Sequence, residues 1–289
     1  MKNSLWKLLC VCALSFAACS KDDPAPYIAD MNTAFPDPTF RAYVVDHFDT
    51  DHDGILSEEE AAAVTTIDVA NGWAIPDKQE ISSLEGLKYF PNLTELNCYY
   101  HKLTALDLSQ NPALVTLQCY DNQLTALNVT QNPALVYLDC AGNQLTSLDV
   151  TQNPELKTLH CWSNQLMALD VTQNPALTRL ICWGNQLTAL DVTQHPALVY
   201  LDCAGNQLTS LDVTQNPALE TLHCQSNQLT SLDLSKTNLG NSTYTDPLDC
   251  APMETLETLY LKAGWSIAGI TTDRSTEFIP EQTEIVFVD

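Results

Sequence analysis

The chain has 289 residues, of which 36 are aspartate or glutamate and 12 are lysine or arginine, so its formal net charge at pH 7 is -24. A surface this acidic repels nucleic acids and anionic membranes, which excludes both as direct binding partners. The hydrophobic content of 45% is enough for a sizeable core, and the length suits one large domain or two smaller ones.

Residues 1–19 have the pattern of an export signal rather than of a folded element. Lys2 and Lys7 form a basic start, and the apolar stretch "LLCVCALSFAA" that follows is too short to cross a bilayer as a helix. The segment "FAAC" resembles the lipobox of bacterial lipoproteins, in which the signal is cleaved before a cysteine that is then lipidated. This resemblance implies that Cys19 is the first residue of the mature chain and carries the membrane anchor. A secretory signal that is cleaved without lipidation is the alternative.

Residues 20–30 follow as a short polar tether that begins "SKDDPAP". Its "KDD" resembles the acidic export signal that places lipoproteins on the outer surface of Bacteroidetes-type bacteria. We therefore expect an outer-membrane lipoprotein exposed at the cell surface, which contacts the membrane only through its lipid anchor. A location on the periplasmic side of the outer membrane is the alternative.

Residues 31–66 predict a small helical cap that contains a calcium-binding loop. The helix-forming segments "DPTFRAYVVDHF" and "SEEEAAAVTTI" flank the stretch "DTDHDGILSEEE", which resembles an EF-hand loop. Calcium prefers a shell of about six to eight oxygen ligands. The expected ligands are the side chains of Asp49, Asp51, Asp53, Ser57 and Glu60 and the main-chain carbonyl of Ile55. Gly54 permits the sharp turn between them.

An acidic helix start without any ion is the alternative for this loop, because carboxylates favour that position anyway. EF-hands usually occur in pairs, whereas this one stands alone. A bound calcium ion would therefore be structural rather than part of a sensor, and a dockerin would need a second such loop.

Residues 67–92 look like a longer, irregular first coil, and residues 93–239 form seven repeats of 21 residues. Each repeat reads L-x-x-L-x-C-x-x-N-x-L and then T-x-L-[DN]-[VL]-[TS], although His101 replaces the asparagine in the first repeat. A fixed period of this length indicates a solenoid, and the spacing is that of leucine-rich repeats. The alternation in "LxxLxC" predicts one short strand per repeat, stacked in parallel on the next strand about 4.8 Å away. The asparagine is expected to bond the main chain of the bend, and the return half predicts extended or 3-10 structure.

One cysteine per repeat occupies the same inward position of the strand. These cysteines are Cys98, Cys119, Cys140, Cys161, Cys182, Cys203 and Cys224. Disulfides are disfavoured because neighbouring parallel strands hold the side chains in a poor geometry for bridging, and a metal site would need local spacings that are missing. We interpret the cysteines as a buried stack of small apolar side chains. Cys250 either extends this stack or lies in the cap that follows.

The repeated "LxxLxCxxNxL" motif resembles the internalin J class of bacterial leucine-rich-repeat proteins, and the resemblance covers all seven repeats. It implies a curved solenoid with a parallel sheet on its concave face, which serves adhesion or other binding. Residues 240–289 are expected to cap the C-terminal end, because a solenoid must close its core. In this cap "LETLYLKAGWSI" predicts a last strand and "EIVFVD" predicts an edge strand beside it.

Aromatic and histidine side chains gather at the strand positions that face away from the core. The residues expected to bind a ligand there are Tyr99, Tyr120, Tyr137, His160, Trp162, Arg179, Trp183, Tyr200 and His223. Exposed aromatics on a rigid sheet tend to mark interaction surfaces, although cross-strand stacking that only stabilises the sheet gives the same pattern. Two aspartate–histidine pairs lie on this face, Asp139 with His160 and Asp202 with His223. No nucleophile accompanies them, so catalytic residues and an enzyme are not expected.

Two functions from different classes remain. The first is a non-enzymatic, monomeric cell-surface module that binds a protein or glycan through the concave face, and the second is a passive structural or scaffolding protein without a specific ligand. Residues 114–176 and 177–239 match as blocks of three repeats, so the face carries two similar patches roughly 14 Å apart. This suits a repetitive ligand such as a glycan, although copying without selection would give the same pattern.

Overall fold

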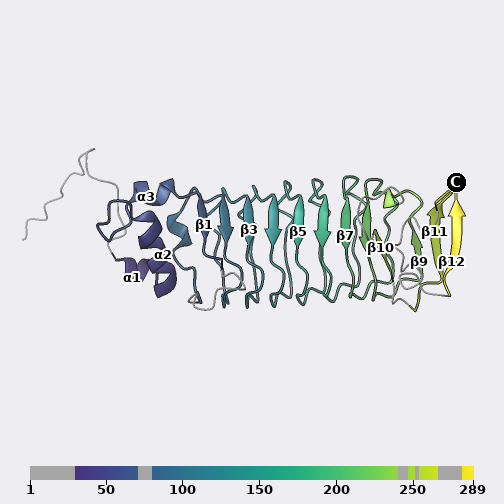
Figure 1. Ribbon diagram of the computed structural model, residues 1–289, viewed down its shortest axis with the longest axis horizontal. Helices are drawn as coiled ribbons and strands as arrows, with labels where there is room; N and C mark the ends of the chain where they lie inside the picture. Colours follow the sequence, from purple (N-terminus) through teal and green to yellow (C-terminus); the bar gives the residue numbers. More distant parts are fainter. Residues whose placement is uncertain (1–29, 71–79, 240–246, 251–253, 266–281) are drawn as a thin grey trace, which may run out of the picture.

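The structure is a computed structural model that describes residues 30–70, 80–239, 247–250, 254–265 and 282–289. These residues form an elongated stack of coils with three short helices at its N-terminal end (Figure 1). Cys19, with the rest of the predicted signal and the tether up to residue 29, lies outside the described residues. Within the described part of the chain, no helix combines the length and the apolar character needed to cross a membrane.

The helices at the N-terminal end are α1 (Met31–Ala34), α2 (Pro38–Phe48) and α3 (Glu58–Ala63). One carboxylate oxygen of Asp37 starts α2, because it accepts hydrogen bonds from the main-chain N–H groups of Thr39 and Phe40. The other oxygen accepts from the main-chain N–H and the hydroxyl of Ser82, at 2.9 and 3.0 Å. A single side chain therefore caps the helix and ties it to the first coil.

Buried aromatic rings join these helices to the solenoid. Phe35 packs against Phe40 with ring centroids 5.6 Å apart and against Phe90 at 5.9 Å, and all three side chains are fully buried. Phe90 comes directly after the short 3-10 helix η1 (Leu87–Tyr89) of the irregular first coil. The helices and the coils therefore share one continuous core.

Each repeat contributes one three-residue strand to a parallel sheet of nine strands. In spatial order the strands are β1 (Thr66–Asp68), β2 (Glu95–Asn97), β3 (Thr116–Gln118), β4 (Tyr137–Asp139), β5 (Thr158–His160), β6 (Arg179–Ile181), β7 (Tyr200–Asp202), β8 (Thr221–His223) and β10 (Leu248–Asp249). From β2 to β8 the central leucine of each strand lies opposite that of the next. A slip of one residue would turn these leucines out of the core, so the constant period fixes the register. The predicted solenoid is confirmed.

The cysteines form a continuous buried row behind the sheet. All seven repeat cysteines are free thiols with no exposed surface. Leu248 pairs with Leu222 in register, so Cys250 lies beside Cys224 and extends the row to eight thiols. Burial raises the pKa of each of these thiols, to about 12 for Cys161. They fill the core and stay protonated, as their position in the repeat predicts.

A row of asparagines at the ninth repeat position stabilises the bend after each strand. In Asn143 the Nδ2 atom donates to the carbonyl oxygens of Cys119 and Cys140, at 3.0 and 3.1 Å. Its Oδ1 atom accepts from the main-chain N–H of Leu124 at 3.0 Å. Two of these three partners belong to the preceding coil, so each asparagine links neighbouring repeats through their buried main chain.

A second buried row lies in the return half of the coils, at the nineteenth repeat position. Its members are Asn111, Asn132, Asn153, Asn174, His195 and Asn216, and each is fully buried. The Nδ2 atom of Asn153 donates to the carbonyl oxygens of Val129 and Asn132, at 3.0 and 2.8 Å. The repeated "TQNP" stretch indicates a turn in the sequence without showing that its asparagine is buried. This row links the return halves as the ninth-position row links the bends.

Histidine replaces asparagine once in each row. The Nε2 atom of His101 lies 2.6 Å from the carbonyl oxygen of Val69, and its Nδ1 atom accepts from the main-chain N–H of Ile81 at 3.2 Å. The Nε2 atom of His195 lies 2.9 Å from the carbonyl oxygen of Val171. The imidazole therefore reproduces part of the asparagine pattern in both places.

A second parallel sheet lies at the C-terminal end, formed by β9 (Ser231–Asp233), β11 (Thr258–Lys262) and β12 (Glu284–Val288). The terminal strand β12 pairs with β11 at the edge, as expected. Leu259 of β11 lies opposite Leu232 in the return half of the last repeat. The predicted last strand therefore extends the return side, because β10 already holds the end of the nine-stranded sheet.

Replacing Asn153 with alanine tests the second asparagine row. The change leaves the buried carbonyl groups of Val129 and Asn132 without their amide donor, so we expect the free energy of unfolding in urea to fall by about 2–4 kcal/mol. Gln152→Ala is the matched control, since its side chain is exposed and its loss should cost less than about 0.5 kcal/mol. Equal stabilities of the two variants would contradict the linking role.

Candidate functional site

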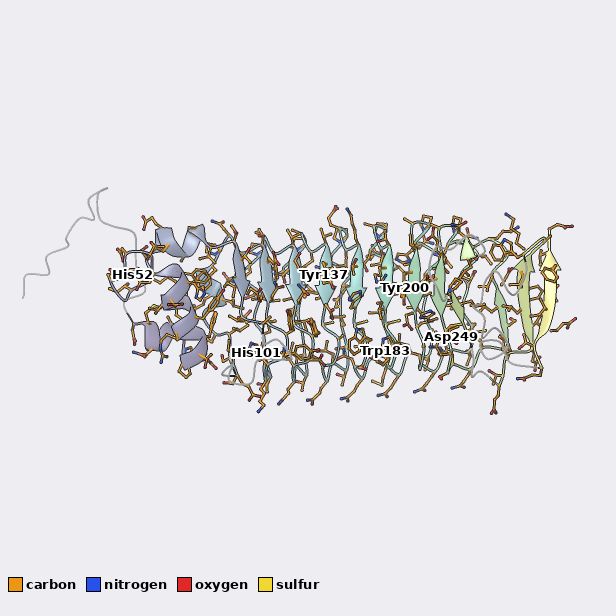
Figure 2. The ribbon with its side chains drawn as sticks, in the orientation of Figure 1. His52, His101, Tyr137, Trp183, Tyr200 and Asp249 are labelled. Carbon is orange, nitrogen blue, oxygen red and sulfur yellow. The ribbon has the colours of Figure 1, made fainter. Side chains whose placement is uncertain are left out.

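The surface formed by the third, fifth, seventh and eighth residues of each repeat, here called the sheet face, carries all nine predicted ligand-binding side chains. These positions lie on or just after the strands, and their side chains point away from the leucine and cysteine core. Tyr137, Trp183 and Tyr200 are labelled on it in Figure 2. Tyr99, Tyr120, Tyr137, His160, Trp162, Arg179, Tyr200 and His223 are half-buried, whereas Trp183 is 37% exposed.

Four aromatic rings form two stacked pairs across neighbouring strands. Tyr99 and Tyr120 stack with centroids 4.3 Å apart and planes 11° from parallel, and Trp162 and Trp183 stack at 4.8 Å and 9°. The separation matches the spacing of parallel strands, so the stacking follows directly from the repeat. Cross-strand stacking is therefore part of what these residues do. Each stacked ring therefore turns one face toward its partner.

Two clusters of tyrosine, histidine and aspartate lie beside the stacked pairs. In the first, the Nδ1 atom of His160 lies 3.1 Å from Oδ2 of Asp139 and 3.4 Å from the hydroxyl of Tyr137. In the second, the Nδ1 atom of His223 lies 3.7 Å from Oδ2 of Asp202 and 3.5 Å from the hydroxyl of Tyr200. The two clusters therefore have nearly the same geometry, as the duplication predicts.

The surroundings of the first cluster are rich in negative charge. Burial raises the pKa of Asp121, and the charge of Asp139 raises it further. Burial and Asp139 also raise the pKa of Tyr137. The charge of Arg179 opposes the rise in the pKa of Tyr137, and a hydrogen bond with Tyr100 opposes the rise in that of Asp121, so the negative charge is compensated in part. The hydroxyl of Tyr137 or Tyr200 lies beside the histidine of its cluster, whereas the thiols are buried in the core with a raised pKa.

Two residues of this surface were missed in the sequence analysis because they occupy the eighth position, just after the strand. Tyr100 and Asp121 both have a positive φ, 58° and 51°. Their side chains are hydrogen-bonded, and the Tyr100 ring packs edge-on against Tyr120 at 5.2 Å. The signal in the sequence is the run of residues at this position, where Gly142, Gly184 and Gly205 also occur.

The predicted calcium loop brings three carboxylates together. One oxygen each of Asp49, Asp51 and Asp53 lies within 4.8 Å of the others. Main-chain N–H groups hold this arrangement: that of Asp53 donates to Asp49 and Asp51 at 3.2 Å, and that of Gly54 donates to Asp49 at 2.9 Å. Gly54 has φ +82°, which suits glycine and makes the predicted turn. An all-oxygen group of this kind fits a hard cation such as calcium.

The remaining predicted ligands lie on the exit side of the loop. Ser57 and Glu60 form a capping box at the start of α3. The Glu60 carboxylate accepts from the main-chain N–H of Thr50 at 2.6 Å and from that of Ser57 at 2.9 Å. Desolvation opposes ionisation, but these hydrogen bonds outweigh it and lower the pKa of Glu60 to about 2. The main-chain N–H of Ile55 donates to Asp53 at 2.8 Å.

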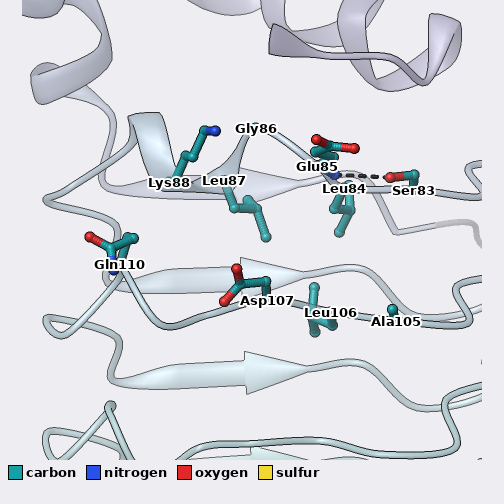
Figure 3. A pocket seen from close by; sticks show the side chains of 10 residues that line it. All are labelled: Ser83, Leu84, Glu85, Gly86, Leu87, Lys88, Ala105, Leu106, Asp107 and Gln110. Carbon is teal, nitrogen blue, oxygen red and sulfur yellow. Dashed lines mark hydrogen bonds between the residues drawn. The ribbon is translucent and has the colours of Figure 1, made fainter. Parts of the chain in front are cut away.

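A cavity of about 320 Å³ lies between the irregular first coil and the return half of the first repeat (Figure 3). It is lined by Ser83, Leu84, Glu85, Gly86, Leu87, Lys88, Ala105, Leu106, Asp107 and Gln110. Hydrogen bonds from Ser109 lower the pKa of Asp107, and the charge of Lys88 adds to this effect. None of the lining residues belongs to the sheet face, so the cavity and the predicted ligand-binding residues are separate.

A family model for leucine-rich repeats, in two copies, matches residues 196–241. The chain has the leucine-rich-repeat solenoid fold. Internalin J of Listeria monocytogenes is 39% identical to it over 81 residues, which is 28% of this chain and 8% of the relative. The solved functional domain of that protein, described as including a cysteine ladder, is 31% identical with a TM-score of 0.48, and the match covers 83% of this chain and 58% of that one.

Two further solved structures show the same fold at low identity. Internalin C2 of Listeria monocytogenes is 19% identical, with a TM-score of 0.51, and the match covers 94% of this chain and 100% of that one. A leucine-rich-repeat protein of Leptospira interrogans is 21% identical, with a TM-score of 0.51, over 80% of this chain and 62% of that one. Leucine-rich-repeat proteins of the internalin kind are generally protein-binding modules that are secreted or lie on the bacterial surface.

Proposed function

We propose that this leucine-rich-repeat protein is a non-enzymatic module of the bacterial cell surface that binds a protein partner through its sheet face. The observation that supports this most directly is the aromatic surface on a rigid sheet, where Trp183 is 37% exposed although a ring of Trp162 stacks on it. Large aromatic side chains at such positions dominate the energetics of many protein interfaces. The class of binding proteins to which its relatives belong supports the same conclusion.

The relatives favour a protein over a glycan, because leucine-rich-repeat proteins of the internalin kind are generally protein-binding modules. The edges, hydroxyl groups and carboxylates of the sheet face also suit the mixed apolar and polar contacts of a protein interface. A passive structural role, the second function that the sequence leaves open, would require no partner for this face.

We also propose that the protein reaches the surface as a lipoprotein of the outer membrane, anchored through Cys19. The support is the sequence of the signal segment, which ends in "FAAC" and is followed by the "KDD" tether. The lipid would hold the first mature residue at the membrane and leave the solenoid beyond it free to meet a partner.

The loop of residues 49–60 is proposed to bind one structural calcium ion. Asp49, Asp51, Asp53 and Glu60 would supply carboxylate oxygens, with further oxygens from Ser57 and the carbonyl of Ile55. Bound calcium would neutralise the three converging carboxylates and fix α3 against α2. The ion would thus rigidify the cap on which the first coil packs.

Trp183→Ala tests the binding function. The labelled soluble chain without residues 1–19 is applied to an array of extracellular proteins and to a glycan array. We expect protein signals that weaken at least about tenfold in the variant, because an aromatic anchor is lost. Met167→Ala is the control, since Met167 is 63% exposed but lies in the return half of its repeat. Signals on glycans alone would contradict a protein partner, and the absence of any signal would support the passive role.

Cys19→Ser tests the lipid anchor. In a bacterium with the lipoprotein pathway, the natural chain should incorporate labelled palmitate and sediment with outer membranes, whereas the variant should do neither. Digestion of the solenoid by protease added to intact cells would support surface exposure. A natural chain that is released without lipid would contradict the proposal.

Calcium removal tests the loop. Saturating calcium at about 100 times its Kd should stabilise the protein by about 2.7 kcal/mol, and a chelator should lower the melting temperature accordingly. Asp51→Asn should remove most of this dependence. Glu58→Gln, which removes one charge from the first turn of α3 without touching a proposed ligand, should keep it. A melting temperature that ignores both calcium and chelator would rule the site out.

A further inference from the structure

The duplication provides two matched surfaces, the first copy (residues 114–176) and the second copy (residues 177–239). Their differences can be compared in one molecule. Tyr137 meets the ring of His160 with centroids 5.6 Å apart at 74°, and Tyr200 meets that of His223 at 5.7 Å and 73°. The two tyrosines therefore stand in the same pose on the same main chain. Any group that lies over one ring has an equivalent place over the other.

The second copy fills this place with a cation of its own. The guanidinium carbon of Arg179, on the strand before Tyr200, lies 3.8 Å from the centroid of the Tyr200 ring. In the first copy the equivalent residue is Thr116, which pairs with Tyr137 on the next strand and carries no charge. Among the described residues, the cation–π contacts involve the rings of Tyr200 and Tyr89, and none involves Tyr137.

A second difference between the copies makes the first one more negative. Asp121 of the first copy corresponds to Gly184 of the second, so the first copy has one more acid as well as one cation fewer. Asp121 is half-buried, which raises its pKa, and the charge of Asp139 lies close enough to raise it further. The side chain of Tyr100 hydrogen-bonds this carboxylate, and its ring packs edge-on against Tyr120.

The whole sheet face likewise has more carboxylates than basic side chains. Its carboxylates are Asp68, Glu95, Asp121, Asp139, Asp202 and Asp249. Arg179 is the one arginine or lysine among the described residues of this face. A partner that brings positive charge would therefore find complementary potential here and long-range attraction from a chain of net charge -24.

We infer that the first copy receives an arginine or lysine side chain of the protein partner, at the place over Tyr137 that Arg179 occupies over Tyr200. This inference rests on the proposed binding function and names the chemistry of the partner. The Tyr137 ring supplies the aromatic face, while Asp121 and Asp139 supply the negative charge. Arginine suits the place better than lysine, because its planar group can stack on the ring and bond a carboxylate at once.

Isothermal titration of the soluble chain with the peptide Gly-Arg-Gly-Arg-Gly tests the inference, with Gly-Asn-Gly-Asn-Gly as the neutral probe. We expect binding of the arginine peptide alone, weakened about tenfold by Asp121→Asn. Asparagine also tolerates the positive φ of this position, so the variant should fold. Asp212→Asn is the control of equal charge change, because Asp212 is exposed on the return half, and it should leave binding unchanged.

Two further variants exchange the residues at the equivalent positions 116 and 179 of the two copies. Thr116→Arg should fill the place from within and abolish peptide binding. Arg179→Thr should open a second site that is about tenfold weaker than the first, because Gly184 stands there in place of Asp121. Equal weakening by Asp121→Asn and Asp212→Asn, or binding that ignores Thr116→Arg, would overturn the inference. If Trp183→Ala removes an array partner that Thr116→Arg leaves bound, the sheet face binds but its ligand is not the proposed cation.

Discussion

The structure depends on one constraint: every coil must satisfy the buried main chain of the coil before it. A strand of three residues makes few ladder bonds, so most of the 21-residue coil would leave polar groups unpaired in the interior. The two asparagine rows meet this need at the bend and in the return half, each through bonds to the preceding repeat. Their regular spacing holds the leucines and cysteines in phase, and the sheet face inherits its order from them.

This dependence explains which features could be predicted from the sequence. The period alone determines the parallel strands, their register and the inward cysteines, because identical coils can stack in few other ways. The role of Asn153 could not be recognised, since "TQNP" is a sound turn signal whether or not its asparagine is buried. The pairing of β11 with β9 was hidden too, because it is decided by β10 already completing the main sheet.

On the sheet face, too, some features could be predicted from the sequence and others could not. Side-chain direction follows from the strand period, so the aromatic and histidine residues could be assigned to one face. Their exposure could not, because a ring on one strand covers the ring on the next at 4.3 or 4.8 Å. Tyr100 and Asp121 were missed because their positive φ carries the chain out of the strand, where alternation no longer says which way a side chain points.

The same regularity that stabilises the solenoid also makes it adaptable. Since the asparagine rows and the core fix the main chain, a change on the sheet face alters its chemistry while the tyrosine–histidine geometry is preserved, 5.6 Å in one copy and 5.7 Å in the other. The two copies differ in charge on this shared main chain. One places Arg179 against its tyrosine, and the other places Asp121 near Asp139. A duplicated surface can therefore keep one patch closed by its own cation while the other remains open to a cation from outside.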